Sequence, residues 1–341
     1  MLQIRVLNHL LDRNEPTFRP LQFIHSRLRD YSIELTTSRD CDYTLVGMHD
    51  FIDKSVPLQE SVDRGLNNLS MIDGEYILVD GSDSTSLLGG YEVLEQSDAL
   101  CLLKNQKFYT REEYKTPYSL GKWFFGEDDE NGFSYDISED MWSRIKFSGY
   151  NLGWLLPHYH DYEPILSGNQ KTNDVCAIFQ ADHKKNYEHG IQNDTYYNNH
   201  RQGLWKVLEP LKSKYKMLTT KMDYPDYVRE LCKSKITISP FGMGELCFRD
   251  FEAMKFGTVL IKPSHRKIDT IPNVMIDDDT FIACEHDWSD LEEKIDYVLS
   301  NYDEVSDQLL NNMRNKYTEE YNVDRLCKHW YDMFSDIIGA A

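Results

Sequence analysis

One short segment, residues 235–263, places two glycines, two glutamates and an arginine at spacings that suit a ligand site. Gly242 and Gly244 stand between an expected strand and an expected helix. Glycines at such a turn let the backbone approach a ligand closely, and the free N–H groups at a helix N-terminus attract an anion. The helix expected over 244–256 carries Glu245, Arg249 and Glu252 at i, i+4 and i+7, so all three lie on one stripe.

The remaining positions of this expected helix are mostly apolar, which predicts a buried helix. They are Leu246, Cys247, Phe248, Phe251, Ala253, Met254 and Phe256. A polar stripe on a buried helix must face a ligand, a cleft or a buried partner, because unpaired burial of charge is costly. The spacing leaves two interpretations open. The stripe either binds an anion or forms a Glu–Arg–Glu ion network that fixes the helix to its neighbours.

Further cationic candidates follow the strand expected over 174–179. His183 and Lys184 lie in the loop directly after it, and Arg201 lies in the helix expected over 194–211. Open α/β sheets bind ligands at the carboxyl ends of their strands, so these side chains are placed to contact a phosphate. Lys262, at the end of another expected strand, is a further candidate. The alternative for the loop residues is an ordinary solvated surface.

Two residues nearer the N-terminus, Asp83 and His49, are candidates for a general base. Asp83 lies in the loop after the strand expected over 76–80, and His49 follows the strand expected over 43–47. A carboxylate or an imidazole can take the proton of an acceptor hydroxyl. Turn and helix-cap chemistry explains Asp83 and its serine-rich surroundings equally well. No set of residues has convincing metal-ligand spacing, so we expect no metal.

The elements that position these residues alternate along the chain in two series. Apolar strands alternate with helices in both series, which predicts parallel sheets covered on both faces. We therefore expect two Rossmann-like α/β domains and a helical C-terminal tail. The boundaries are 1–150 for the first domain, 151–171 for a hinge, 172–323 for the second domain and 324–341 for a C-terminal helix that crosses back.

Composition excludes several classes of protein. The 37 Lys and Arg residues against 57 Asp and Glu give a net charge of −20, which disfavours nucleic-acid binding. No stretch is apolar enough for a membrane span. The seven cysteines are scattered and form no CxxC pair, which is typical of a reduced, cytoplasmic protein.

The segment around Gly242 resembles the donor-binding half of glycosyltransferases with the GT-B fold. The similarity is greatest to the exostosin-like and family-1-type group, which includes relatives in large DNA viruses and phages. The matching residues are Ser239 to Glu245, then Arg249 to Ala253, then Gly257 before the next apolar strand. The retaining enzymes of this fold separate their two glutamates by seven residues. Here six residues separate Glu245 from Glu252, so the reaction could either invert or retain the configuration of the transferred sugar.

This resemblance implies two domains facing across a cleft and a hexosyl- or pentosyltransferase of glycan biosynthesis. The second domain would bind a nucleotide-sugar co-substrate, UDP- or GDP-linked, and the first a glycan or glycoconjugate acceptor. Glu252 would hold the ribose, and Glu245 would lie near the sugar or phosphates. Arg249 and a helix N-terminus would neutralise the leaving diphosphate without metal or other cofactor. The alternatives are a non-catalytic nucleotide-sugar or glycan-binding protein on this scaffold, and an acidic interaction protein.

Overall fold

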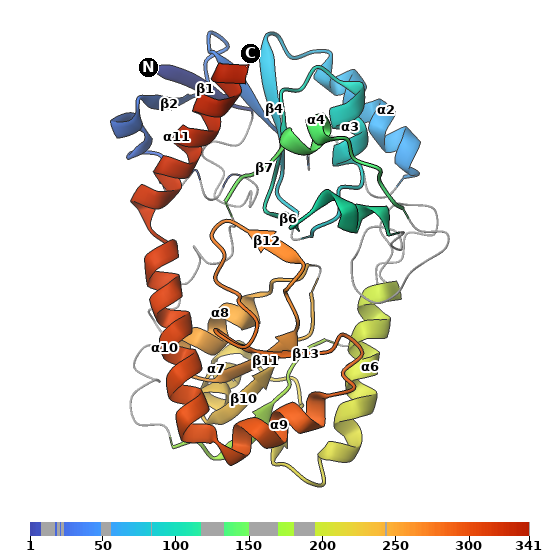
Figure 1. Cartoon of the computed structure of the whole chain (residues 1–341), viewed down its shortest axis with the longest axis vertical. Coiled ribbons are helices and arrows are strands. Elements are labelled where there is room, and N and C mark those ends of the chain that lie inside the picture. The colour runs from blue at the N-terminus through green and yellow to red at the C-terminus, as the bar shows by residue number, and fades with distance from the viewer. Residues whose placement is uncertain are drawn as a thin grey trace.

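The computed structural model describes residues 1–7, 18, 21, 24–48, 56–82, 84–116, 133–149, 170–180, 195–242 and 244–340. Two parallel β-sheets follow one another along the chain, each with helices packed on it, and helices make up the C-terminal region (Figure 1). The predicted α/β class with two Rossmann-like sheets and a helical C-terminal region is confirmed.

The N-terminal sheet has the strand order β2-β1-β3-β4-β5-β7, with every pairing parallel. Its strands are β1 (Leu2–Val6), β2 (Ile33–Thr36), β3 (Tyr43–Gly47), β4 (Glu75–Asp80), β5 (Leu102–Lys104) and β7 (Ile145–Phe147). The sequence predicted β1, β3, β4 and β5 but not β2 or β7. These two lie at the edges of the sheet and are short, so neither shows a long apolar run.

The C-terminal sheet has the order β13-β11-β10-β8-β9, again with every pairing parallel. Its strands are β8 (Asn173–Cys176), β9 (Met217–Leu218), β10 (Ser234–Ile238), β11 (Val259–Pro263) and β13 (Ile282–Cys284). The apolar run 274–276 predicts a further strand, but the structure has none there. That segment enters a turn in which Asp278 has a φ of 57°, and β13 is the edge strand instead.

Both sheets share one strand order when their strands are counted along the chain. In each, the second strand lies outside the first, and the third lies on the first strand's other side. In such doubly wound sheets, ligands bind at the carboxyl ends of the first and third strands, where the order of the strands reverses. These switch points lie between β1 and β3 and between β8 and β10.

The helices pack apolar faces against the two sheets. They are α2 (Leu58–Leu69), α3 (Gly90–Gln96), α4 (Glu139–Ser143), α6 (Thr195–Leu211), α7 (Tyr224–Cys232), α8 (Phe248–Lys255), α9 (Leu291–Ser300), α10 (Tyr302–Glu320) and α11 (Val323–Ala340). Short 3-10 helices occupy η1 (Leu28–Tyr31) and η3 (Arg111–Lys115). Among the described residues, no helix combines the length and the apolar character needed to cross a membrane.

The last helix, α11, packs on the N-terminal sheet although it follows the C-terminal one (Figure 1). Trp330 and Phe334 share a core cluster with Ile4 of β1 and Ile77 of β4. The apolar face of α11 is thus buried against strands that lie far from it in the sequence. The domain boundaries stay a prediction, because residues 150–169 lie outside the described residues.

The two halves also contact each other through a small antiparallel pair. Strand β6 (Gln106–Phe108), which follows β5, pairs with β12 (Ile268–Thr270), which follows β11. Both strands come directly after the carboxyl end of a sheet strand. The carboxyl edges of the two sheets are therefore turned toward the same contact.

Candidate functional site

The C-terminal switch point is bordered by the loops that follow β8 and β10, and Arg201 of α6 connects them. Its Nε donates to the carbonyl oxygen of Phe241 at 2.8 Å, and its Nη1 donates to the carbonyl oxygen of Gln180 at 2.7 Å. Arg201 is buried in this position. Arg201, which was predicted to contact a phosphate, therefore also joins the two loops that border the switch point.

The turn after β10 leaves little room for a side chain at position 242. The N–H of Gly242 donates to the carbonyl oxygen of Gly244 at 2.8 Å. A Cβ at position 242 would lie 3.2 Å from the Sγ of Cys247 and 3.7 Å from an Nη atom of Arg201. Close approach at Gly242 therefore brings the turn, Cys247 and Arg201 into one compact unit.

Helix α8 begins later than predicted, and Glu245 is not part of it. The carboxylate of Asp250 accepts a hydrogen bond from the backbone N–H of Cys247 at 2.9 Å, so the helix begins at Phe248. Glu245 lies in the turn that precedes α8. The prediction that Glu245, Arg249 and Glu252 share one helix is therefore wrong for Glu245. Phe248 is 46% exposed, so the helix is also less completely buried than its composition predicted.

Arg249 and Glu252 do share helix α8, and both contact neighbouring elements. The Nη1 of Arg249 donates to the Oγ of Ser239 at 3.3 Å. The carboxylate of Glu252 accepts from the hydroxyls of Tyr224 at 2.9 Å and Tyr227 at 3.0 Å. Burial, together with the Glu252 charge, raises the pKa of Tyr227 well above its ordinary value, so its hydroxyl remains a donor.

Glu245 reaches into the N-terminal half instead. Its Oε1 accepts from the backbone N–H of Thr85 at 3.2 Å and from the Oγ1 of Thr85 at 2.6 Å, and its Oε2 accepts from the Nε2 of Gln106. The side chain is fully buried. Burial raises the pKa of Glu245 to about 8, while the bonds from Thr85 and the charge of Lys104 oppose that shift.

A buried ion pair fixes the base of the same turn. The Nζ of Lys262 lies 2.6 Å from the Oδ2 of Asp250, with both side chains inaccessible to solvent. The same Nζ donates to the carbonyl oxygen of Glu245 at 2.9 Å, and Ser239 donates to Asp250 at 2.6 Å. Lys262 is thus committed to the fold, which corrects its interpretation as a phosphate ligand.

Three histidines that the sequence analysis missed surround Phe241 at this edge. The ring centroids of His200, His265 and His286 lie 5.5, 5.7 and 5.4 Å from that of Phe241. Burial lowers the pKa of each, and that of His286 falls to about 3, so all three are neutral at physiological pH. Their positions after β11 and β13, and on α6, were the available signal.

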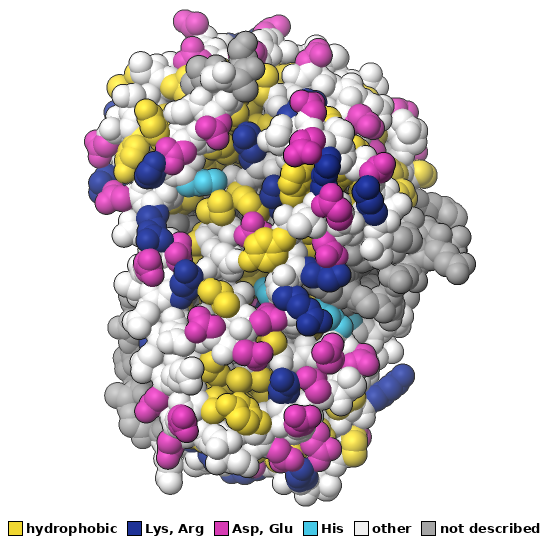
Figure 2. Space-filling view, in the orientation of Figure 1, with side chains coloured by type: hydrophobic (Ala, Val, Ile, Leu, Met, Phe, Trp, Pro, Cys, Tyr) yellow, Lys and Arg dark blue, Asp and Glu magenta, His cyan; other side chains and the backbone are white. Residues whose placement is uncertain are grey.

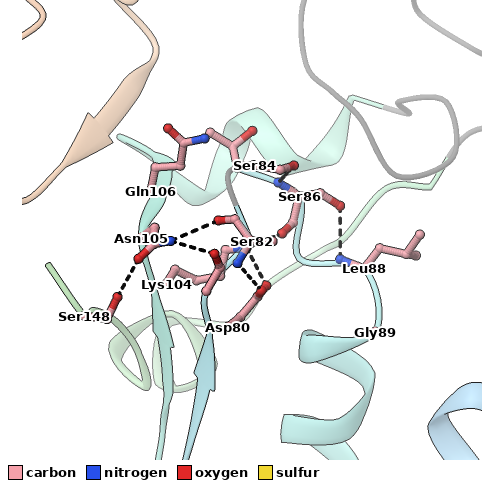
Figure 3. Close-up of polar contacts among 12 residues, drawn as sticks. Asp80, Ser82, Ser84, Ser86, Leu88, Gly89, Lys104, Asn105, Gln106 and Ser148 are labelled. Carbon is pink, nitrogen blue, oxygen red and sulfur yellow. Dashed lines mark hydrogen bonds and ion pairs between the residues drawn. The ribbon is translucent and has the colours of Figure 1, made fainter. Parts of the chain in front are cut away.

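The carboxyl edge of the N-terminal sheet carries a different network, centred on Lys104 at the end of β5 (Figure 3). Its Nζ donates to Asp80 at 2.6 Å, to the carbonyl oxygen of Ser86 at 2.6 Å and to the Oγ of Ser82 at 3.3 Å. Asn105 donates to the carbonyl oxygen of Gly81 at 2.8 Å. The sequence analysis named neither Lys104 nor Asn105, although both directly follow an apolar run.

Four predicted site residues lie outside the described part of the chain: His49, Asp83, His183 and Lys184. In the sequence they follow β3, β4 and β8. Their predicted roles stay predictions. In the described ranges, no group of three or more His, Cys, Asp or Glu side chains is arranged to hold a metal ion.

No protein-family model matches the sequence, and neither does any protein of curated function. Solved structures similar to the chain include a glycosyltransferase from Rickettsia africae, with 11% identity, a TM-score of 0.46, and coverage of 100% of this chain and 99% of that one. An alpha-glucosyltransferase in complex with UDP has 12% identity, a TM-score of 0.45, and coverage of 98% and 99%. A putative UDP-N-acetylglucosamine 2-epimerase from Listeria monocytogenes has 12% identity, a TM-score of 0.39, and coverage of 94% and 80%.

Glycosyltransferases are thus among the structures similar to this chain, as the resemblance of the Gly242 segment predicts. The identities and TM-scores are low, so we base the functional proposal on the chain's own residues.

Proposed function

We propose that this protein is a glycosyltransferase that moves a sugar from a nucleotide-sugar to a hydroxyl of a glycan or another acceptor. The donor would bind at the switch point between β8 and β10, and the acceptor at the carboxyl edge of the N-terminal sheet. One observation carries the proposal. The turn after β10 reaches the loop after β4 through Glu245 and Thr85, so two ligand-binding edges of doubly wound sheets meet.

The donor edge has the groups that a nucleoside diphosphate requires. Arg249 is only partly buried and lies one turn before Glu252 on α8. A guanidinium keeps its charge and can bind a phosphate through two parallel hydrogen bonds, which would stabilise the charge of the leaving diphosphate. Glu252 would accept hydrogen bonds from the ribose hydroxyls alongside those from the tyrosines.

The surface charge supports a small anionic ligand rather than a nucleic acid. On the face drawn in Figure 2, basic side chains are interspersed with acidic ones and do not form a continuous basic patch. The net charge of −20 repels a polyphosphate backbone over long distances. A nucleoside diphosphate requires only a few cations at short range, which the donor edge supplies.

Ligand-induced stabilisation tests the proposal directly. We expect one of UDP, GDP, ADP, TDP and CMP to raise the melting temperature, because a ligand that binds only the folded state stabilises it. Arg249→Met should abolish most of that shift. Arg229→Met is the matched control, because Arg229 lies on the exposed surface of α7, paired with Asp226. Absence of a shift with every nucleotide would refute the donor site.

A turnover assay separates the enzyme from a binding protein on the same scaffold. The nucleotide that stabilises the protein would be supplied as its sugar conjugate, and release of the free nucleoside diphosphate would be measured with and without candidate acceptors. Acceptor-dependent release is the expected result. Tight nucleotide binding without release would favour a non-catalytic nucleotide-sugar-binding protein.

A further inference from the structure

We propose that Glu245 is a positioning residue that holds the donor-side turn against the acceptor-side loop. This inference rests on the proposed function and assigns Glu245 a role other than contact with the donor. In this role the carboxylate touches no substrate. It aligns two segments, residues 239–247 and residues 84–86, that would carry the two reactants.

The contact joins elements far apart in the sequence. Thr85 and Gln106 precede Glu245 by 160 and 139 residues, and they approach its carboxylate from two separate segments, the loop after β4 and strand β6. Three donor atoms converge on the two oxygens, so the carboxylate is held in both distance and orientation. Glu245 is fully buried, so water does not compete for these donors.

Each side of the contact is separately anchored. On the donor side, the Nζ of Lys262 binds the carbonyl oxygen of Glu245 and the carboxylate of Asp250. On the acceptor side, the hydroxyl of Tyr114 donates to the carbonyl oxygen of Thr85 at 2.8 Å, and Lys104 binds the carbonyl oxygen of Ser86. A shift of one segment relative to the other would therefore break hydrogen bonds at Glu245.

A positioning role has a kinetic signature. A small misplacement of two reactants slows the chemical step by as much as about 100-fold, whereas binding of each reactant to its own half is retained. Loss of the Glu245 contact should therefore lower kcat and leave nucleotide affinity almost unchanged. A residue that contacts the donor would instead weaken nucleotide binding when it is removed.

The decisive experiment removes the contact from the side opposite the donor. We expect Gln106→Ala and Glu245→Ala each to lower kcat about 10- to 100-fold, with a nucleoside diphosphate Kd within about twofold of the wild type. The double variant should be little slower than Glu245→Ala alone, because Glu245→Ala already removes the bond from Gln106 together with the two from Thr85. Glu245→Gln keeps one oxygen acceptor and should retain part of kcat.

A matched control is the ion pair between Lys267 and Glu113, which also joins the two halves but is 43% and 28% exposed. Glu113→Ala should leave kcat and Kd near wild-type values, since exposed pairs contribute little. A wild-type kcat in folded Gln106→Ala would overturn the inference, as would a weakened nucleotide Kd in Glu245→Ala with kcat intact. If Glu245→Ala fails to fold, Gln106→Ala and Glu245→Gln still decide the question. Failure of the proposed function would be separate, visible as an absence of nucleotide binding by the wild type.

Discussion

The two carboxyl edges of this molecule are built on the same strand order but offer opposite chemistry. The C-terminal edge carries two arginines, Arg201 and Arg249, and a glycine turn that packs closely against Arg201. At the N-terminal edge, the charge of Lys104 is paired with Asp80, and the surrounding groups are serines and an asparagine (Figure 3). The same scaffold thus places arginines beside a glycine turn at one edge, and a lysine–carboxylate pair among hydroxyl and amide groups at the other.

Both edges also contain a buried lysine, and the two lysines differ in how far their carboxylate partners are exposed to solvent. Lys262 and its partner Asp250 are both inaccessible to solvent, whereas Asp80, the partner of Lys104, keeps 15% of its side chain exposed. A charge stranded by mutation is costlier when water cannot reach it. The difference between the edges should therefore be measurable as stability.

The largest expected effect comes from removing these lysines. Lys262→Met should reduce the free energy of unfolding by about 3–5 kcal/mol, because it leaves Asp250 as an uncompensated buried charge. Lys104→Met should cost less, because the partly exposed Asp80 can be solvated by water. Denaturant melts of both variants give the comparison, and equal losses would show that the two edges do not differ in this respect.

The next effect concerns the ligand at the C-terminal edge. Glu252→Ala should weaken nucleoside diphosphate binding about 10- to 100-fold, which corresponds to about 1.4–2.8 kcal/mol. Calorimetric titration measures this, with Glu230→Ala on α7 as a control, because Glu230 pairs with Lys233 and Asn173 rather than with the switch point. Unchanged affinity in a well-folded Glu252→Ala protein would refute the donor-site assignment. A collapse of stability would instead identify Glu252 as a structural acceptor for Tyr224 and Tyr227.

The effect of pH at the contact between the edges is smaller per pH unit. Burial raises the pKa of Glu245 to about 8 from its ordinary value of 4.5, so between these values the folded protein keeps a proton that the unfolded chain loses. This contribution to stability is complete below the unfolded pKa and declines by at most about 1.4 kcal/mol per pH unit as pH rises toward 8.

The charged and titratable groups around Glu245 define the control for that measurement. Lys104 faces its carboxylate, while Lys262 and His265 bind its backbone. The Glu245→Gln protein retains these groups and lacks only the titrating proton. We therefore expect the free energy of unfolding of the wild type, measured relative to that of Glu245→Gln, to fall between pH 5 and pH 8 and to stay level above. A pH-independent difference would contradict the raised pKa.

The smallest expected effect is that of a chelator. Because Arg249 supplies permanent positive charge at the donor edge, turnover should be unchanged by EDTA. Complete loss of activity that Mn²⁺ or Mg²⁺ restores would contradict this and would point to carboxylates as metal ligands. The assay thus tests whether cationic side chains distinguish the C-terminal edge functionally.

Much of the fold followed from local pattern. Apolar runs such as Tyr76–Asp80 and Lys235–Ser239 predicted β4 and β10 to within a residue, because central strands of a covered parallel sheet are apolar on both faces. The spacing also predicted the glycine turn and the position of Arg249 and Glu252 on one helix. Strands β2, β7 and β13 escaped detection because edge strands are short and need little apolar sequence.

The hydrogen-bond and ion-pair partners of individual side chains could not be predicted from local sequence patterns. Glu245 shares a sequence segment with Arg249, yet Asp250 caps α8 at Cys247 and leaves Glu245 outside the helix. Its carboxylate then meets Thr85 and Gln106, which no local pattern connects to it. In the same way, nothing in the run around Lys262 indicates that its charge is paired with Asp250 rather than available to a ligand.

The sequence by itself determined the two alternating α/β series, the turn at Gly242 and the helical C-terminal region, because propensity and hydrophobic period act over a few neighbouring residues. Only the tertiary structure decided which side chains meet. Three contacts join segments more than 100 residues apart: the packing of α11 on β1, the pairing of β6 with β12, and the hydrogen bonds between Glu245 and Thr85. Such contacts depend on how complete surfaces fit together, and burial then sets the charge state of the groups they enclose.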